Sequence, residues 1–377
     1  MRLRHPDGTT LHLGYCTNVH PAEDLAGVLG QLDDYAVPVR ERLGTDVLGL
    51  GLWLAAPVAA ELAADPATVR RLAAELRARG LEVVTLNGFP YRAFQAPVVK
   101  HAVYHPDWTT PERLDHTLRL AGILAGLLPD DAARGSISTL PLAWREPWDT
   151  ERYDSCRRNL DDLAAGLAAV ADRTGRTVRV AFEPEPGCVV ETTADAVTWL
   201  SGVDTRRLGV CLDLAHLACA WEDPATALAG LHAAGLPVVK VQVSAALASA
   251  DPAAEEQALR RYVEPRFLHQ TRSRDGLATD DLTGALDRGP AGDPWRVHYH
   301  VPLHATPEPP LTSTVDVLRD ALRSLVGGPA PVCDHLEVET YTWDVLPAGQ
   351  RPRSAAGLAG GIAAELAFAR DEVTALW

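Results

Sequence analysis

Short β-like runs alternate with helical stretches along the whole chain, and this alternation is the feature that most restricts its fold. Eight apolar runs of strand length lie at residues 11–15, 47–52, 81–86, 136–139, 178–182, 208–212, 238–243 and 336–339. Helical stretches rich in Ala, Leu and Arg lie between them, at 66–79, 111–127, 153–173, 193–200 and 316–325. Such alternation gives a parallel sheet with right-handed crossovers. Eight strands predict an α/β fold, a closed (β/α)8 TIM barrel, as one domain over residues 1–377.

The main alternative for this alternation is an open, doubly wound sheet. Its nucleotide-binding version carries GxGxxG or GxxxxGK[ST] after an early strand, and the sequence has neither motif there. Two segments are longer than a minimal barrel needs, namely 88–110 after the third strand and an insertion at 251–303 after the seventh. Long loops at the C-terminal side of barrel strands commonly form lids and binding loops.

The composition narrows the class of protein. A net charge of −15 over 377 residues argues against a nucleic-acid partner, because phosphate backbones are bound by basic surfaces. The six cysteines lie far apart and form no CxxC pair, as expected for free thiols in a reducing compartment. The N-terminus has no apolar signal core, and no apolar run reaches 18 residues. We expect a soluble, cytoplasmic protein.

Acidic side chains and an imidazole follow three of the predicted strands: Glu183 and Glu185 after the fifth, Asp213 and His216 after the sixth, and Glu337 and Glu339 in the eighth. Such residues also cap helices or pair with arginines at strand ends. If Glu183, Asp213 and Glu339 meet at one barrel mouth, their three carboxylates cannot all ionise without a cation among them. The sequence therefore predicts a divalent metal (Zn, Mn or Mg), with further nitrogen ligands from His216 or from the histidines of HYHVPLH, which are His298, His300 and His304.

Period-two alternation in the seventh strand puts Lys240, Gln242 and Ser244 on one face. A buried lysine can act as a Schiff-base nucleophile, but an ion pair with a neighbouring inward carboxylate is the favoured interpretation for Lys240. The aromatic side chains of the 88–110 loop either line a pocket or pack as loop core. Trp343, after the last strand, has the same two interpretations.

The motifs FEPEPG, GVCLDLAH and HLEVET, on successive predicted strands, resemble the xylose-isomerase-like TIM-barrel superfamily, which includes sugar isomerases, ketose epimerases and the endonuclease IV type of repair enzyme. The resemblance implies site roles for Glu183, Asp213, His216 and Glu339. The superfamily's strand-seven histidine falls on Gln242, which is a departure, because an amide oxygen is a weaker, neutral ligand. The run His298-Tyr299-His300 is similar to the acid-x-His pair of the nuclease branch and offers replacement ligands.

Over nearly the whole chain the resemblance is closest to the EboE-type metabolite-traffic proteins. It rests on NGFPYRAF, VYHPDW, FEPEPGCVVETT, VCLDLAHLACAWEDP, KVQVSAAL, HYHVPL and HLEVETYTWDVLP. It implies a role in processing or moving a small natural-product precursor, with a functional link to proteins of the same gene cluster.

The leading functional hypothesis is a metal-dependent isomerase or epimerase, in which Glu183 and Glu339 are both metal ligands and proton carriers. The predicted metal ligands are Glu183, Asp213, His216, Gln242, His298, His300 and Glu339. The predicted substrate contacts are Lys240, Glu185, Glu337, His304, Asn87 and Trp343. A non-catalytic metabolite-binding protein is the alternative, and a metal-dependent phosphodiesterase is disfavoured by the net charge.

Overall fold

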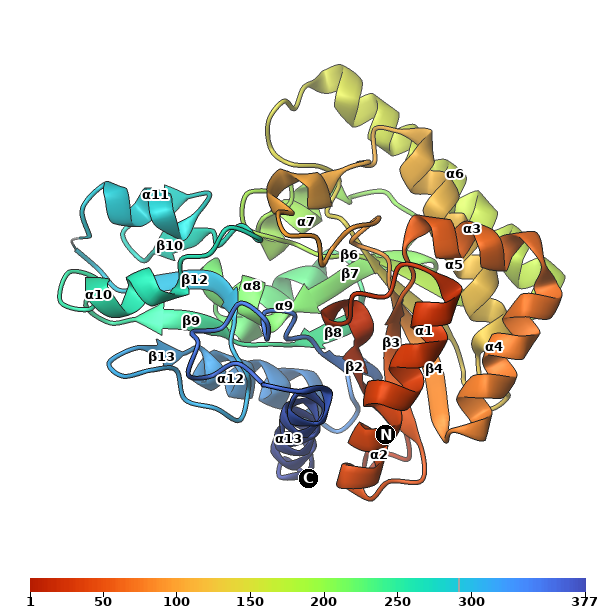
Figure 1. Ribbon diagram of the computed structural model, residues 1–377. Helices are drawn as coiled ribbons and strands as arrows, with labels where there is room; N and C mark the ends of the chain where they lie inside the picture. The colour runs from red at the N-terminus through yellow and green to blue at the C-terminus, as the bar shows by residue number, and fades with distance from the viewer. Residues whose placement is uncertain (291) are drawn as a thin grey trace.

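The computed structural model describes residues 1–290 and 292–377 and contains a closed barrel of eight parallel strands (Figure 1). The barrel strands are β2 (Thr10–Cys16), β3 (Leu48–Trp53), β4 (Leu81–Asn87), β5 (Gly135–Thr139), β6 (Val178–Phe182), β7 (Leu208–Asp213), β8 (Val238–Val243) and β14 (His335–Val338). Pairing of β2 with both β3 and β14 closes the barrel. The predicted fold class is confirmed, and each predicted run overlaps one barrel strand. Strand β1 (Arg2–Arg4) adds antiparallel to β2.

Helices surround this barrel in Figure 1. They are α1 (Leu25–Gln31), α2 (Val37–Leu43), α3 (Ala56–Ala64), α4 (Pro66–Ala78), α5 (Pro111–Leu127), α6 (Thr150–Thr174), α7 (Thr193–Trp199), α8 (Leu214–Cys219), α9 (Pro224–Ala233), α12 (Val315–Val326) and α13 (Ala355–Thr374). Helix α6 starts before the predicted residue 153 because the Asp149 side chain accepts a hydrogen bond from the Arg152 N–H at 2.9 Å. Sequence periodicity does not predict α8, because all six of its residues are buried.

The chain segment between β8 and β14 forms a second sheet. It consists of β11 (Ala278–Thr279), β10 (Thr271–Ser273), β12 (Trp295–His300), β9 (Ala246–Ser249) and β13 (Thr312–Ser313), in that order and with antiparallel pairing. The short helices α10 (Glu256–Leu259) and α11 (Leu282–Asp287) accompany it. The sheet starts before the predicted insertion at 251–303 and ends after it. Its longest strand, β12, carries His298 and His300.

The barrel interior holds a fully buried ion pair. Lys240 Nζ on β8 lies 3.1 Å from Glu337 Oε2 on β14, and neither side chain is exposed. A Cβ at Gly51 of β3 would lie 1.5 Å from Glu337, so only glycine leaves room for this carboxylate. The ion pair was the favoured of the two interpretations for Lys240, and the structure confirms it. Among the described residues, no helix is both long and apolar enough to cross a membrane.

Candidate metal centre and pocket

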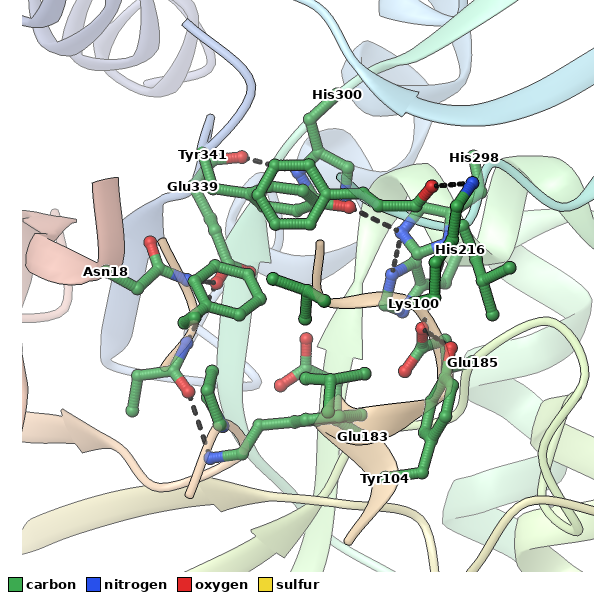
Figure 2. A pocket seen from close by; sticks show the side chains of 18 residues that line it. Asn18, Lys100, Tyr104, Glu183, Glu185, His216, His298, His300, Glu339 and Tyr341 are labelled. Carbon is green, nitrogen blue, oxygen red and sulfur yellow. Dashed lines mark hydrogen bonds and ion pairs between the residues drawn. The ribbon is translucent and has the colours of Figure 1, made fainter. Parts of the chain in front are cut away.

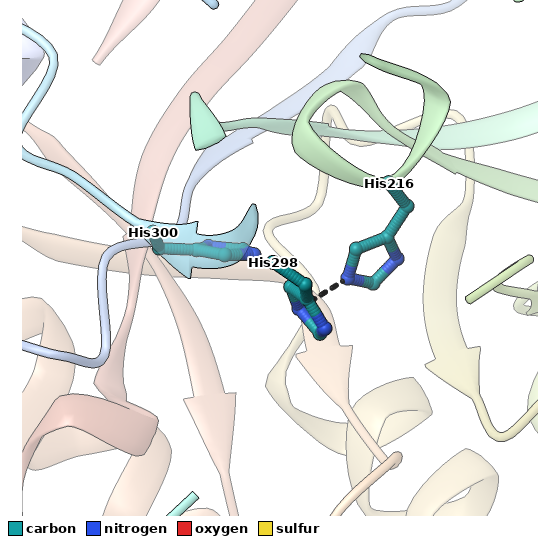
Figure 3. Close-up of side chains that lie close together, drawn as sticks. All are labelled: His216, His298 and His300. Atoms are coloured by element: carbon teal, nitrogen blue, oxygen red, sulfur yellow. Dashed lines mark hydrogen bonds between the residues drawn. The ribbon is translucent and has the colours of Figure 1, made fainter. Parts of the chain in front are cut away.

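Three histidines meet at the barrel mouth (Figure 3), and the Nδ1 of each lies within hydrogen-bond distance of an oxygen. His216, in the first turn of α8, has Nδ1 at 2.9 Å from the Pro184 carbonyl. His298 and His300, on β12, have Nδ1 at 2.7 Å from Gln270 Oε1 and at 2.6 Å from the Glu339 carbonyl. Because these acceptors carry no hydrogen, each Nδ1 is the protonated nitrogen. The three Nε2 atoms therefore carry lone pairs.

The Nε2 atoms of His216 and His298 lie 2.9 Å apart, so two lone pairs face each other at close range. Burial lowers the pKa of His216 to about 4 and that of His298 well below its ordinary value, so both rings are neutral at pH 7. The third atom, His300 Nε2, is buried without a hydrogen-bond partner among the described residues. A cation shared by the three nitrogens would remove this repulsion.

Carboxylates complete the mouth beside these rings. Asp213 ends β7, and its Oδ1 accepts hydrogen bonds from the His216 N–H at 2.8 Å and from Ser244 Oγ at 2.9 Å. Asp213 thus caps α8 with one oxygen, while Oδ2 has no hydrogen-bond partner in the described structure and lies 3.8 Å from His300 Nε2. Asp213 is therefore both the helix cap and the candidate ligand that the sequence suggested as alternatives.

Glu339 and Glu183 flank Asp213. Glu339 Oε1 accepts hydrogen bonds from Nδ2 of Asn18 at 2.7 Å and of Asn87 at 2.8 Å, which fixes the carboxyl group. Burial, and then the charges of Asp213 and Glu337, raise the pKa of Glu339 to about 8. Burial, and then the charges of Glu339 and Asp213, raise the pKa of Glu183 well above its ordinary value. The mouth is therefore short of positive charge.

The donor set fits a divalent metal ion. Three overlapping triads each bring their ligand atoms within 4.8 Å of one another: His216 with His298 and His300, Glu183 with Asp213 and His216, and Asp213 with His300 and Glu339. Glu183 Oε2, like Asp213 Oδ2 and His300 Nε2, is buried with no hydrogen-bond partner among the described atoms. Imidazole nitrogens and carboxylate oxygens are ligands that suit Zn and Mn, and Mg prefers the oxygens.

Gln242 is the register partner of Asp213 on β7 and of Glu337 on β14. Its side chain is fully buried, and both amide atoms lack a hydrogen-bond partner in the described structure. It does not line the pocket, whereas His298 and His300 do. The nitrogen ligands nearest the carboxylates thus come from α8 and from the second sheet, not from β8.

A pocket opens over the centre (Figure 2). Of the residues with a predicted site role, its wall includes Glu183, Glu185, His216, His298, His300, Glu339 and Asn87. Phe89, Phe94 and Tyr104 of the 88–110 loop also line it. Tyr91 and Trp108 do not, because Tyr91 packs on His116 and Trp108 is buried against Phe182. Both interpretations of this aromatic loop are therefore correct, each for some of its residues.

Four predicted substrate contacts do not reach the pocket wall: Lys240, Glu337, His304 and Trp343. The first two neutralise each other inside the barrel. His304 stacks on Trp343 with ring centroids 6.3 Å apart, and Trp343 packs so closely on α13 that a Cβ at Gly361 would lie 2.5 Å from its ring. These contacts are consistent with packing roles.

The sequence predicts Tyr104 as one of the loop aromatics that either line a pocket or pack as core, and it gives no indication that Gln270 belongs to the site. Tyr104 OH donates to Glu185 Oε1 at 2.7 Å and accepts from Gln270 Nε2 at 2.9 Å, while Gln270 Oε1 accepts from His298 Nδ1. This series of hydrogen bonds connects Glu185, whose pKa burial raises to about 8, to an imidazole of the candidate metal centre. Asn18, Lys100 and Tyr341 also line the pocket, and no motif singles them out.

Comparison with known proteins agrees with this architecture. Residues 41–253, more than half of the chain, match the family described as xylose isomerase-like TIM barrel. Solved structures with a similar fold include an L-ribulose 3-epimerase (13% identity, 97% of this chain and 95% of that chain, TM-score 0.51). Others are a xylose isomerase-like TIM barrel protein from Mycobacterium smegmatis in complex with magnesium (14%, 97% and 98%, 0.53) and the IolI protein with a bound zinc atom (13%, 97% and 99%, 0.51).

At these identities the structural likeness shows the fold alone. A search of curated proteins gives no significant match. The family match, the closed parallel barrel and the acids at its mouth lead to one conclusion: the chain belongs to the xylose isomerase-like TIM barrel family.

Proposed function

We propose that this chain is a metal-dependent isomerase or epimerase that moves a proton on a hydroxy-carbonyl small molecule. The observation that carries the proposal is the convergence of three imidazole lone pairs with the unpaired buried carboxylate oxygens of Glu183 and Asp213 at the barrel mouth. Burying such groups without a partner costs several kcal/mol. A protein that keeps them together gains from a bound cation.

The residues that would hold the metal are Glu183, Asp213, His216, His298, His300 and Glu339. A divalent cation, when bound, supplies a Lewis acid that polarises a substrate carbonyl group. Glu183 and Glu339 follow β6 and β14 on either side of Asp213, so each can take up or return a proton. Asn18 and Asn87 orient Glu339 for this role. Gln242 stays a weaker candidate ligand, because an amide oxygen carries no charge.

The EboE-type role, processing or movement of a natural-product precursor with partners from one gene cluster, belongs to the same proposal and rests on the sequence motifs. A cytoplasmic location is supported by the six cysteines, all of which are free thiols. The net charge of −15 supports a small-molecule substrate over a nucleic acid.

Metal removal and return test the proposal. We expect Zn or Mn to stabilise the chelator-treated protein by about 4 kcal/mol at 1,000 times the dissociation constant, measured as a rise in unfolding free energy. Asp213→Asn should abolish this gain. Glu365→Gln is the matched control, because Glu365 is a buried carboxyl group outside the pocket. The metal-loaded protein should also exchange the hydrogen next to the carbonyl of a ketose for deuterium. Absence of both metal-induced stabilisation and exchange would refute the proposal.

A further inference from the structure

The pocket has two chemically different halves. The acids and imidazoles form one half of its lining, here called the floor, and the other half, the wall, is apolar and aromatic. Phe94, Phe267 and Tyr341 pack against one another there, with ring centroids 4.9 to 5.3 Å apart. Val99 and Val103 extend this wall. A ligand whose polar head reaches the floor must therefore lay the rest of its surface on apolar groups.

The apolar wall is held in place by backbone hydrogen bonds between two distant segments. The N–H groups of Val99 and Lys100 donate to the Arg266 carbonyl at 2.7 and 2.9 Å. Lys100 adopts φ of 43°, a left-handed backbone that costs a lysine energy and is retained where the surroundings enforce it. Because the 88–110 loop and the loop that precedes β10 are joined in this way, the wall is a preformed surface.

Positive charge at the pocket is already neutralised. Lys100 is the one Lys or Arg among the described lining residues, and its Nζ donates to Asp281 Oδ2 at 2.5 Å and to the Phe267 carbonyl at 2.6 Å. The other ionisable lining groups include the carboxyls of Glu183, Glu185 and Glu339. Phosphate groups are bound by free Arg, Lys or clustered N–H donors. Away from a cation bound at the floor, a phosphate would meet carboxylates below and hydrocarbon above.

From this division we infer that the pocket takes an unphosphorylated hydroxy-carbonyl compound that carries an apolar substituent, with the substituent lying on Phe94, Phe267 and Val103. The inference rests on the proposed function for the head group. The apolar substituent would lie in the other half of the pocket, so the inference and the proposed function can fail separately.

Binding of a homologous series tests the inference. The probes are 1-hydroxy-2-alkanones from hydroxyacetone to 1-hydroxy-2-octanone, compared with dihydroxyacetone and dihydroxyacetone phosphate, titrated calorimetrically into metal-free and Zn-loaded protein. Each added methylene should tighten binding about fourfold in both forms, because each is buried on the wall. The phosphate ester should bind no tighter than dihydroxyacetone. A series that is flat with chain length, or a phosphate ester that binds tenfold tighter, overturns the inference.

Two valines of the same loop give a matched pair of variants. Val103 lines the pocket, whereas Val98 is 62% exposed and does not. Val103→Asp should weaken 1-hydroxy-2-octanone at least tenfold and leave hydroxyacetone within twofold, while Val98→Asp should change neither. Equal effects of the two variants would overturn the inference. If the methylene gain appears but Zn has no effect on any probe, the inference stands and the proposed metal chemistry fails.

Discussion

The middle of the barrel and its mouth contain buried charges on the same strands, but the protein compensates them differently. On β14, Glu337 points into the middle and pairs with Lys240, and both side chains are fully buried. Two residues later, Glu339 reaches the mouth, where the neutral amides of Asn18 and Asn87 bind it. The middle thus contains its own counter-charge, and the mouth lacks one.

The base of the barrel holds another buried acid, Glu82 at the start of β4, which gives the same contrast with Glu339. Burial alone would raise the pKa of Glu82, but hydrogen bonds from His12 and Arg2 outweigh it and lower the pKa to about 2. At the mouth the pKa of Glu339 is raised to about 8. The chain therefore supplies charged partners for the buried acid at the base, whereas the acid at the mouth has only neutral amides as partners.

Breaking the Lys240–Glu337 ion pair in the middle of the barrel should have the largest effect on the free energy of unfolding. Burial alone would lower the pKa of Lys240, but the Glu337 carboxylate outweighs it and keeps that pKa above its ordinary value. Lys240→Met leaves Glu337 buried without a partner, so we expect a loss of about 3–5 kcal/mol in the free energy of unfolding, measured with urea.

The second lysine is the control for this prediction. Lys100 and Asp281 form an ion pair in which each side chain is 26% exposed, so Lys100→Met should cost about 1 kcal/mol or less. The double variant Lys240→Met with Glu337→Gln should recover part of the loss. If the two lysine variants cost the same, the buried pair does not act as its geometry indicates.

Changing Glu82, at the base of the barrel, should have a smaller effect on the free energy of unfolding, and this effect should depend on pH. Because the pKa of folded Glu82 lies below its unfolded value of about 4.5, its stabilisation is present above pH 4.5 and is lost as the pH falls towards 2. Allowing for the partly exposed Arg2, Glu82→Gln should cost about 2 kcal/mol at pH 7 and nothing near pH 2. Thermal unfolding between pH 2 and 7 measures this. Glu75→Gln, at a surface pair, should change stability by less than 0.5 kcal/mol, and a parallel pH dependence in both variants would contradict the assignment.

The sequence predicts the barrel and the acids of its mouth because both are local patterns. Each strand is an apolar run, and Glu183, Asp213 and Glu339 lie next to such runs. It does not predict that Gln270 or Asn18 belongs to the site, because their position depends on the packing of loops far apart in the chain. It also leaves Glu337 and Glu339 indistinguishable, since period two puts both on the inward face; Gly51 and Lys240 decide which one is paired.

The smallest predicted effect concerns Gln270. At the mouth this side chain is a fixed hydrogen-bond partner of His298, as Glu337 in the middle is a fixed ion-pair partner of Lys240. Its Oε1 holds the proton on His298 Nδ1, so the lone pair lies on Nε2, which faces His216 and the Tyr341 hydroxyl group. Gln270→Leu removes this acceptor and permits the tautomer with a protonated Nε2. We expect Zn affinity, measured by calorimetry, to fall at least tenfold, or by about 1.4 kcal/mol.

Gln270→Glu keeps an oxygen acceptor for His298 and should bind Zn at least as well as the unmodified protein, which a general packing role of Gln270 would not explain. Gln31→Leu, at a buried glutamine of α1 that does not line the pocket, should leave Zn affinity unchanged. Equal Zn affinity in Gln270→Leu and Gln31→Leu would mean that His298 keeps its tautomer without help. The mouth would then be organised by its metal alone, whereas the middle is organised by its own side chains.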